Sequence, residues 1–198
     1  MYSKPRLEAL TDGLFAVAMT ILVLDVRLPD DFHAVDQVAL MRALFALWPK
    51  FFPYALSFYV LGSTWLANVK LRSRGEFVDR RCAFWWLFYL FLATCLPFST
   101  SVVGRFFHYG PAIWLYTLNM AALSAVGYRL TVLLPDLDDD KHTLDRKVSL
   151  AFLLGTSVLC AALSPLAQGR ALWVYILNFG SGPVARWLDK KRQVSDRA

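Results

Sequence analysis

The 198 residues are 57% hydrophobic and only 18% charged, whereas an average soluble chain is roughly 45–50% apolar and about 25% charged. Such a composition excludes intrinsic disorder, and 10 Gly, 9 Pro and 3 Cys exclude collagen-like and disulfide-stapled chains. The net charge of +6 does not indicate nucleic-acid binding, because the basic residues lie between apolar segments and form no continuous stripe. We therefore expect an integral membrane protein.

Six apolar segments predict an all-α membrane protein with six transmembrane helices. Four of them are free of charge over about 20 residues, which is long enough to cross a bilayer unaided. The first and last have shorter uncharged cores, Gly13 to Leu24 and Ala171 to Ala185, whose polar ends must lie at headgroups or inside protein. The predicted spans are 6–27, 49–70, 82–104, 111–132, 148–168 and 171–188, forming a single unit over residues 1–198.

The distribution of basic residues predicts the orientation of these spans. With six spans both termini lie on one side, and that side carries 16 of the 21 lysines and arginines. Basic residues concentrate in cytoplasmic loops, so we expect a cell-membrane protein with both termini in the cytoplasm. Most tryptophans fall near predicted span boundaries, as interfacial belts require, but Trp65 lies deeper.

Residues 35–48, between the first two spans, have the pattern of an amphipathic helix. Val38, Met41, Phe45 and Trp48 recur at helical spacing, with polar residues between them. We expect this helix to lie on the outer side and to run into the second span.

The sequence shows no sign of enzymatic or metal chemistry. The histidines His33, His108 and His142 lie in predicted loops without a second ligand at metal spacing. A P-loop, a nucleophile elbow and a dinucleotide fingerprint are all missing, and the acidic run at 136–140 lacks the glycine and glutamate of a calcium loop. All cysteines fall inside predicted spans, so we expect no disulfide. We expect neither an enzyme nor a resident cofactor.

Charged residues at both ends of the first apolar segment distinguish it from the others. Arg6, Glu8 and Asp12 precede its core, and Asp25 follows directly. Charges so close to the hydrocarbon are costly, tend to face protein or water, and mark a functional site by default. The alternative is that they anchor a short helix at the headgroups.

The segment from Arg6 to Asp25 resembles the first helix of bacterial homologues of the endolysosomal potassium channel family, the TMEM175 proteins. That family is recognised by Arg, three variable residues, and then Phe-Ser-Asp. Arg6 and Asp12 match this pattern, while Leu10 and Thr11 replace the Phe and the Ser. The six-span layout and the sequences at 47–51 and 96–98 also resemble the family, although Asn68 stands where members often have His.

The resemblance implies a homotetramer in which the first helices line a central pore without a carbonyl filter. The pore and its hydrophobic gate would then be formed by Val17, Ile21 and Leu24, with Thr20 beside them contributing to potassium selectivity. Asp25 would attract cations at the outer mouth. The motif residues Arg6, Leu10, Thr11 and Asp12 would form a network, with Arg6 and Asp12 buried, that holds the first helix against its neighbours.

Alternatives remain for these residues and for the function. Without the resemblance, a stripe of Val17, Ile21 and Leu24 is typical of lipid-facing or packing residues, and Thr20 would bond to a backbone carbonyl. The hypothesis is a potassium-preferring channel whose partners are the lipid bilayer and permeant monovalent cations. A proton-coupled carrier or proton leak using first-helix carboxylates is the alternative, and a non-conducting scaffold is a third.

Overall fold

The structure is a computed structural model that describes residues 1–70, 76–134, 140–185, 187 and 189. Its elements, in chain order, are β1 (Tyr2–Ser3), α1 (Lys4–Leu22), η1 (Val23–Asp25), α2 (Gln37–Ala46), α3 (Trp48–Lys70), β2 (Phe77–Val78), α4 (Arg80–Arg105), α5 (Gly110–Leu133), α6 (Asp140–Ala167) and η2 (Gln168–Gly180). Residues 181–185 continue as α-helix after η2.

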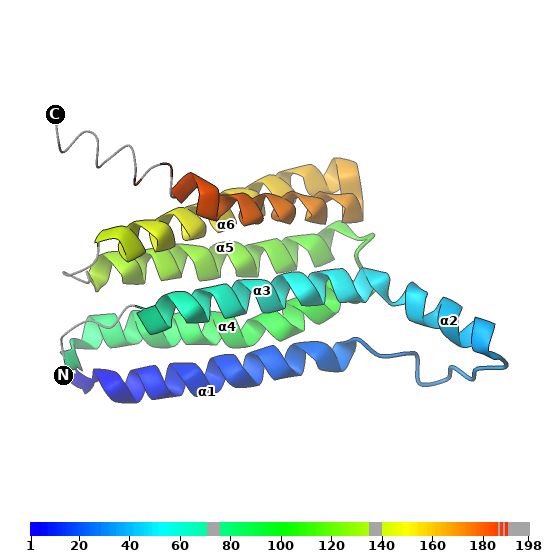
Figure 1. The fold of residues 1–198 in the computed structure, drawn as a ribbon, viewed down its shortest axis with the longest axis horizontal. Coiled ribbons are helices and arrows are strands. Elements are labelled where there is room, and N and C mark those ends of the chain that lie inside the picture. The colour runs from blue at the N-terminus through cyan, green and yellow to red at the C-terminus, as the bar shows by residue number, and fades with distance from the viewer. Residues whose placement is uncertain (71–75, 135–139, 186, 188, 190–198) are drawn as a thin grey trace.

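The long helices run side by side, and α2 extends beyond one end of the bundle (Figure 1). Within the bundle, α4 packs against α1, α3 and α5, and α5 in turn packs against α6. The η2 segment returns along α6, so the bundle has one group of α1, α3 and α4 and a second of α5, α6 and η2. The first helix therefore lies at the edge of the subunit.

Several helices begin at residues that are typical of helix N-termini. Asp36 caps α2 by accepting a hydrogen bond from the Ala39 amide at 2.6 Å, and Asp79 caps α4 through the Cys82 amide at 2.8 Å. A proline occupies the first turn of both α1 and α5, where its missing N–H costs nothing. The α2 helix confirms the predicted amphipathic helix, and it meets α3 with a bend of 47°.

By length and composition, only some of these helices qualify as membrane spans. Among the described residues, Lys4–Asp25, Arg80–Arg105 and Thr143–Ala167 are long and apolar enough, and α2 with Trp48–Leu66 would be a fourth if the bent pair forms one span. The membrane character is thereby supported, while the predicted count of six spans stays a prediction.

An all-α fold is not quite what the structure shows. Tyr2 and Ser3 pair antiparallel with Val78 and Phe77, which forms a two-stranded sheet of two residues each. Strands this short have no alternating pattern that a sequence could reveal. A second difference is that the last predicted span begins as the long 3₁₀ segment η2.

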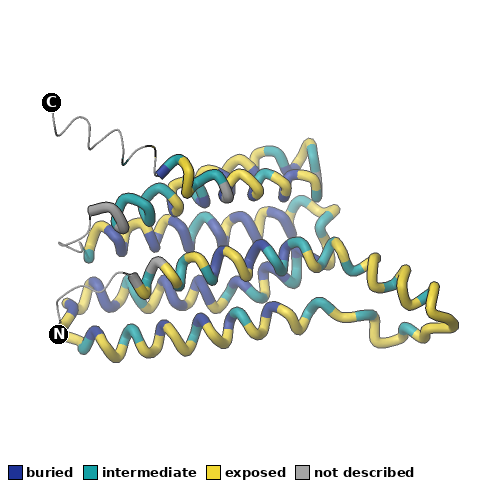
Figure 2. The backbone as a smooth tube through the Cα atoms, viewed as in Figure 1, coloured by how far each residue is buried: buried dark blue, intermediate teal, exposed yellow. Residues whose placement is uncertain are grey.

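Buried residues concentrate in α4 and α5 (Figure 2), and hydrogen bonds between hydroxyls and amides cross the core. Ser57 contacts Thr100 at 2.8 Å and Tyr116 at 3.0 Å, so three helices meet at one hydroxyl. Tyr175 donates to Ser157 at 2.9 Å between η2 and α6. Unsatisfied polar groups are costly in an apolar medium, so these pairs fix the register between helices. The three cysteines are free, as predicted.

Candidate functional site

The start of α1 is fixed to the chain that precedes α4. The β1–β2 pairing is extended by the Lys4 amide, which donates to the Glu76 carbonyl at 2.9 Å. The Lys4 side chain is only 4% exposed, and its ammonium lies 3.3 Å from the Glu8 carboxylate. Glu8 is therefore held by Lys4, one turn away on the same helix.

One face of α1 packs into the subunit. Thr11, Phe15, Ala18 and Leu22 are buried, with spacings of four, three and four residues that place them on one side of the helix. The Phe15 ring is completely buried and lies 6.0 Å from the ring of Tyr89 in α4. This face contacts α3 and α4 and explains why α1 stays attached to the bundle.

The opposite face of α1 carries the predicted pore residues, and the subunit leaves it uncovered. Val17, Ile21 and Leu24 are 53%, 45% and 68% exposed. Thr20 is also exposed, and its hydroxyl donates to the Val17 carbonyl at 2.9 Å. The backbone bond that Thr20 was expected to form in isolation is therefore present. The pore-lining roles of these four residues stay a prediction.

Two tryptophans hold the family motif against the neighbouring helices. The indole N–H of Trp86 in α4 donates to the Thr11 hydroxyl at 2.9 Å, and Thr11 in turn donates to the Leu7 carbonyl at 2.7 Å. The indole N–H of Trp65 in α3 donates to Asp12 Oδ1 at 2.8 Å. Adjacent motif residues thus connect α1 to two different helices.

The motif residues Arg6 and Leu10 lie outside this hydrogen-bonded arrangement. In the single subunit Arg6 and Asp12 are both exposed, and the buried network expected for them stays a prediction. Arg6 makes no ion pair with any described residue. Leu10, which replaces the family's Phe, is also exposed. The network in this subunit therefore consists of Thr11, Asp12 and the two indoles.

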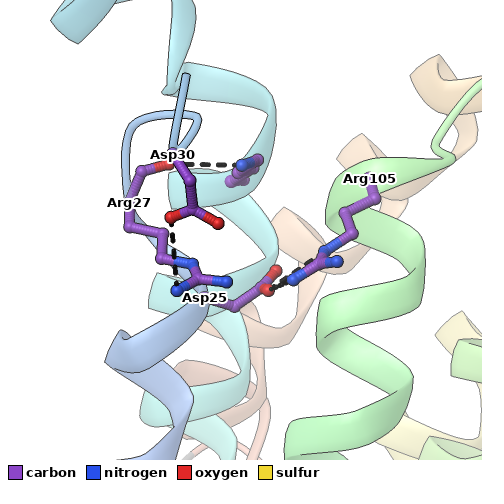
Figure 3. A network of polar contacts seen from close by, with 5 residues as sticks. Asp25, Arg27, Asp30 and Arg105 are labelled. Atoms are coloured by element: carbon purple, nitrogen blue, oxygen red, sulfur yellow. Dashed lines mark hydrogen bonds and ion pairs between the residues drawn. The ribbon is translucent and has the colours of Figure 1, made fainter. Parts of the chain in front are cut away.

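The η1 turn that follows α1 is anchored by an ion pair (Figure 3). Arg105, the last residue of α4, donates to Asp25 Oδ1 through Nε at 3.1 Å and through Nη2. Just beyond, Arg27 lies 3.6 Å from Asp30, and the Lys50 ammonium donates to the Arg27 carbonyl at 3.3 Å. The side chain of Asp25 is 19% exposed. A carboxylate paired with an arginine attracts other cations less strongly than a free one, so the outer-mouth role of Asp25 stays a prediction that must include Arg105.

Sequence reasoning missed three residues at this site, namely Trp65, Trp86 and Arg105. Two signals were present in the sequence. Trp65 lay too deep for an interfacial tryptophan, and an indole N–H at that depth needs a hydrogen-bond acceptor. Asp25 and Arg105 end their predicted spans on the same side of the membrane with opposite charges. In the part of the chain that the structure describes, no group of three or more His, Cys, Asp and Glu could hold a metal ion.

Comparison with known proteins shows which family the chain resembles. Residues 6–97 match the family described as the endosomal/lysosomal potassium channel TMEM175. Over these residues the chain is similar to the TMEM175 channels. The resemblance seen in the first helix is confirmed, and the matched proteins are channels rather than enzymes.

Individual relatives extend the match beyond the first helix. The chain is 32% identical over 130 residues to a potassium channel of Streptomyces collinus, which covers 63% of this chain and 61% of that one. It is 36% identical over 74 residues to the endosomal/lysosomal proton channel TMEM175 of Homo sapiens, covering 35% of this chain and 15% of that one. The aligned part thus spans less than two thirds of either relative.

A solved structure matches the whole fold. The crystal structure of a lysosomal potassium-selective channel TMEM175 homolog from Chamaesiphon minutus superposes with a TM-score of 0.75 at 25% identity, covering 91% of this chain and 97% of that chain. The helical bundle therefore has the fold of this channel homologue.

Proposed function

We propose that the chain is a potassium-preferring cation channel of the cell membrane, built from four copies around a central pore lined by α1. The proposal rests above all on one observation: the helix that carries the family motif presents Val17, Ile21 and Leu24 on a face that its own subunit does not cover. Six spans with both termini in the cytoplasm are part of the proposal.

The aliphatic stripe suits a gate that closes by excluding water. Four copies of Val17, Ile21 and Leu24, spaced at i, i+4 and i+7, would form stacked apolar rings around the axis. A narrow apolar ring dewets and blocks ions without any charged group. Widening of the rings would readmit water and cations.

In this proposal, Thr20 contributes to selectivity beside these rings. Its hydroxyl hydrogen is directed to the Val17 carbonyl, so the lone pairs of the oxygen face outward from the helix. Four such oxygens could replace part of the hydration shell of a cation. This favours potassium, which releases its water more easily than sodium does.

The face of α1 next to the stripe also suits close packing between subunits. Ala9, Gly13 and Ala16 are exposed, and a Cβ built on Gly13 would meet no atom within 4 Å of its own subunit. Small residues at this spacing let membrane helices approach closely. Contact between neighbouring copies of α1 would thus leave the aliphatic stripe facing the axis.

The second candidate function is a proton pathway, and the human relative named a proton channel favours it. The carboxylates of α1 could titrate during transport, but each has a partner: Glu8 has Lys4, Asp12 has Trp65 and Asp25 has Arg105. A proton carrier would have to break one of these contacts in every cycle. We therefore place it second.

A reversal-potential measurement on purified protein in planar bilayers separates the two candidates. Potassium, sodium and proton gradients are opposed across the same membrane. The channel proposal predicts a reversal potential that follows the potassium gradient. A potential that follows pH alone would establish the proton pathway, and absence of any current would reject both.

A further inference from the structure

A cavity of 280 Å³ lies away from α1, between α3, α4, α6 and the chain after η2. Its polar wall includes Ser63, Thr64, Asp145, Arg146, Asn178 and Ser181. The rest of the wall is apolar and formed mainly by leucine, valine and tyrosine side chains. An apolar pocket with a few convergent polar groups is the usual form of a ligand site.

Apart from the Arg146 guanidinium, the polar wall offers mainly acceptors. The Asp145 Oδ1 atom is buried and has no hydrogen-bond partner among the described residues. The hydroxyl hydrogens of Ser63 and Ser181 are already donated to the Val60 and Asn178 carbonyls, at 3.0 and 2.7 Å. Thr64 likewise donates to backbone carbonyls of its own helix. A ligand that brings N–H donors would satisfy this wall.

The charges of the wall restrict the ligand further. Arg146 follows Asp145 directly, and it makes no ion pair with a described residue. The guanidinium disfavours a lone metal cation, and the carboxylate disfavours a simple anion. A zwitterion with a primary ammonium and a phosphate matches both charges, because arginine binds phosphate well.

The location of the cavity indicates where such a zwitterion comes from. Asp145 and Arg146 lie in the first turn of the span-capable segment Thr143–Ala167, which is close to headgroup depth. Above them on α3, Tyr59 and Leu66 line the cavity and are also exposed on the outer surface of the subunit. An acyl chain could lie along these residues while the headgroup enters the cavity.

We propose that this cavity binds the headgroup of a phosphatidylethanolamine-class phospholipid. The ammonium donates to Asp145 and to the hydroxyl oxygens of Ser63 and Ser181, and the phosphate binds Arg146. Choline headgroups have no N–H and leave Asp145 unsatisfied. This site is independent of ion conduction and of the proposed pore.

Native mass spectrometry of the full-length protein in detergent tests the site. The probes are dioleoyl phosphatidylethanolamine, phosphatidylcholine and phosphatidylglycerol, together with soluble phosphoethanolamine. We expect phosphatidylethanolamine to bind about tenfold more tightly than phosphatidylcholine, because hydrogen bonds to a charged group are lost with choline. Equal binding of these two lipids would overturn the proposal. If soluble phosphoethanolamine binds as tightly as the lipid, the assignment to a lipid is overturned.

Variants connect the preference to the named residues. Asp145→Asn should remove most of the preference for ethanolamine over choline. Arg146→Gln should weaken the binding of all three lipids. Lys147→Gln is the matched control, because Lys147 is the next cation along α6 and does not line the cavity. Ser63→Leu, on the exposed side of α3, fills the cavity and should abolish the preference even if Asp145→Asn fails to fold. A preference retained in Ser63→Leu would contradict the proposal.

Discussion

The two faces of α1 are similar in composition and differ in what covers them. Phe15, Ala18 and Leu22 are buried against α3 and α4, while Val17, Ile21 and Leu24, a residue or two away along the helix, are exposed. In a helix that is apolar all round, hydropathy alone does not distinguish these faces. The buried face therefore serves the fold of the subunit, and the uncovered face is available for assembly and function.

The largest expected effect concerns stability and separates the faces directly. Phe15→Ala removes a completely buried ring and should lower the free energy of unfolding by about 3–5 kcal/mol. Val17→Ala, on the uncovered face, should cost far less. Thermal unfolding of the purified variants in detergent measures both changes in stability. Equal losses of stability in the two variants would show that the two faces do not differ in how they support the fold.

The next effect concerns the gate. Ile21→Asn and Leu24→Asn place amides in the proposed apolar rings, which should wet the pore and raise potassium flux about tenfold, or ~1.4 kcal/mol off the barrier. Leu118→Asn, on an α5 residue that is 69% exposed, is the control and should leave flux unchanged. Flux into liposomes gives the comparison, and the gate assignment fails if the α1 variants behave like the control.

A smaller effect concerns the anchoring of the buried face. Trp86→Phe keeps an aromatic ring but removes the donor to Thr11, and Thr11→Val removes the acceptor while keeping the shape. A double-mutant cycle of unfolding free energies should give a coupling of about 1 kcal/mol. Strictly additive losses would mean that the indole contact does not stabilise α1.

The smallest effect concerns selectivity on the uncovered face. Thr20→Ala removes one hydroxyl from each subunit without changing the aliphatic stripe. The permeability ratio of potassium to sodium should fall about threefold, or ~0.6 kcal/mol. Bi-ionic reversal potentials report this ratio, and an unaltered value would exclude Thr20 from ion contact.

Local patterns in the sequence predicted much of the fold. The uncharged run from Cys82 to Val103 is α4 without its two terminal residues at each end, and the spacing of Val38, Met41 and Phe45 predicted α2. These features depend on neighbours along the chain. The sequence could not reveal the β1–β2 pair, because two residues carry no period.

Contacts between distant residues were the part of the site that the sequence could not supply. Trp65 meets Asp12 across 53 residues and Arg105 meets Asp25 across 80 residues. Such pairs depend on which helices pack together, and hydropathy does not determine which helices are neighbours. For the same reason, the sequence placed Arg6 with Asp12 in a buried network that the subunit does not form.

The central claim is that the uncovered face of α1 lines the ion pathway, and cysteine modification tests it most directly. The parent residues of Leu24→Cys and Leu118→Cys have nearly equal exposure in the subunit, 68% and 69%, but Leu24 lies in η1 directly after α1 and Leu118 lies in α5. A thiol-reactive cation is applied while potassium current is recorded, with the parent protein and its three native cysteines as background. The account predicts block of the current in Leu24→Cys and none in Leu118→Cys. Unblocked current in Leu24→Cys, or equal block in both variants, would contradict it.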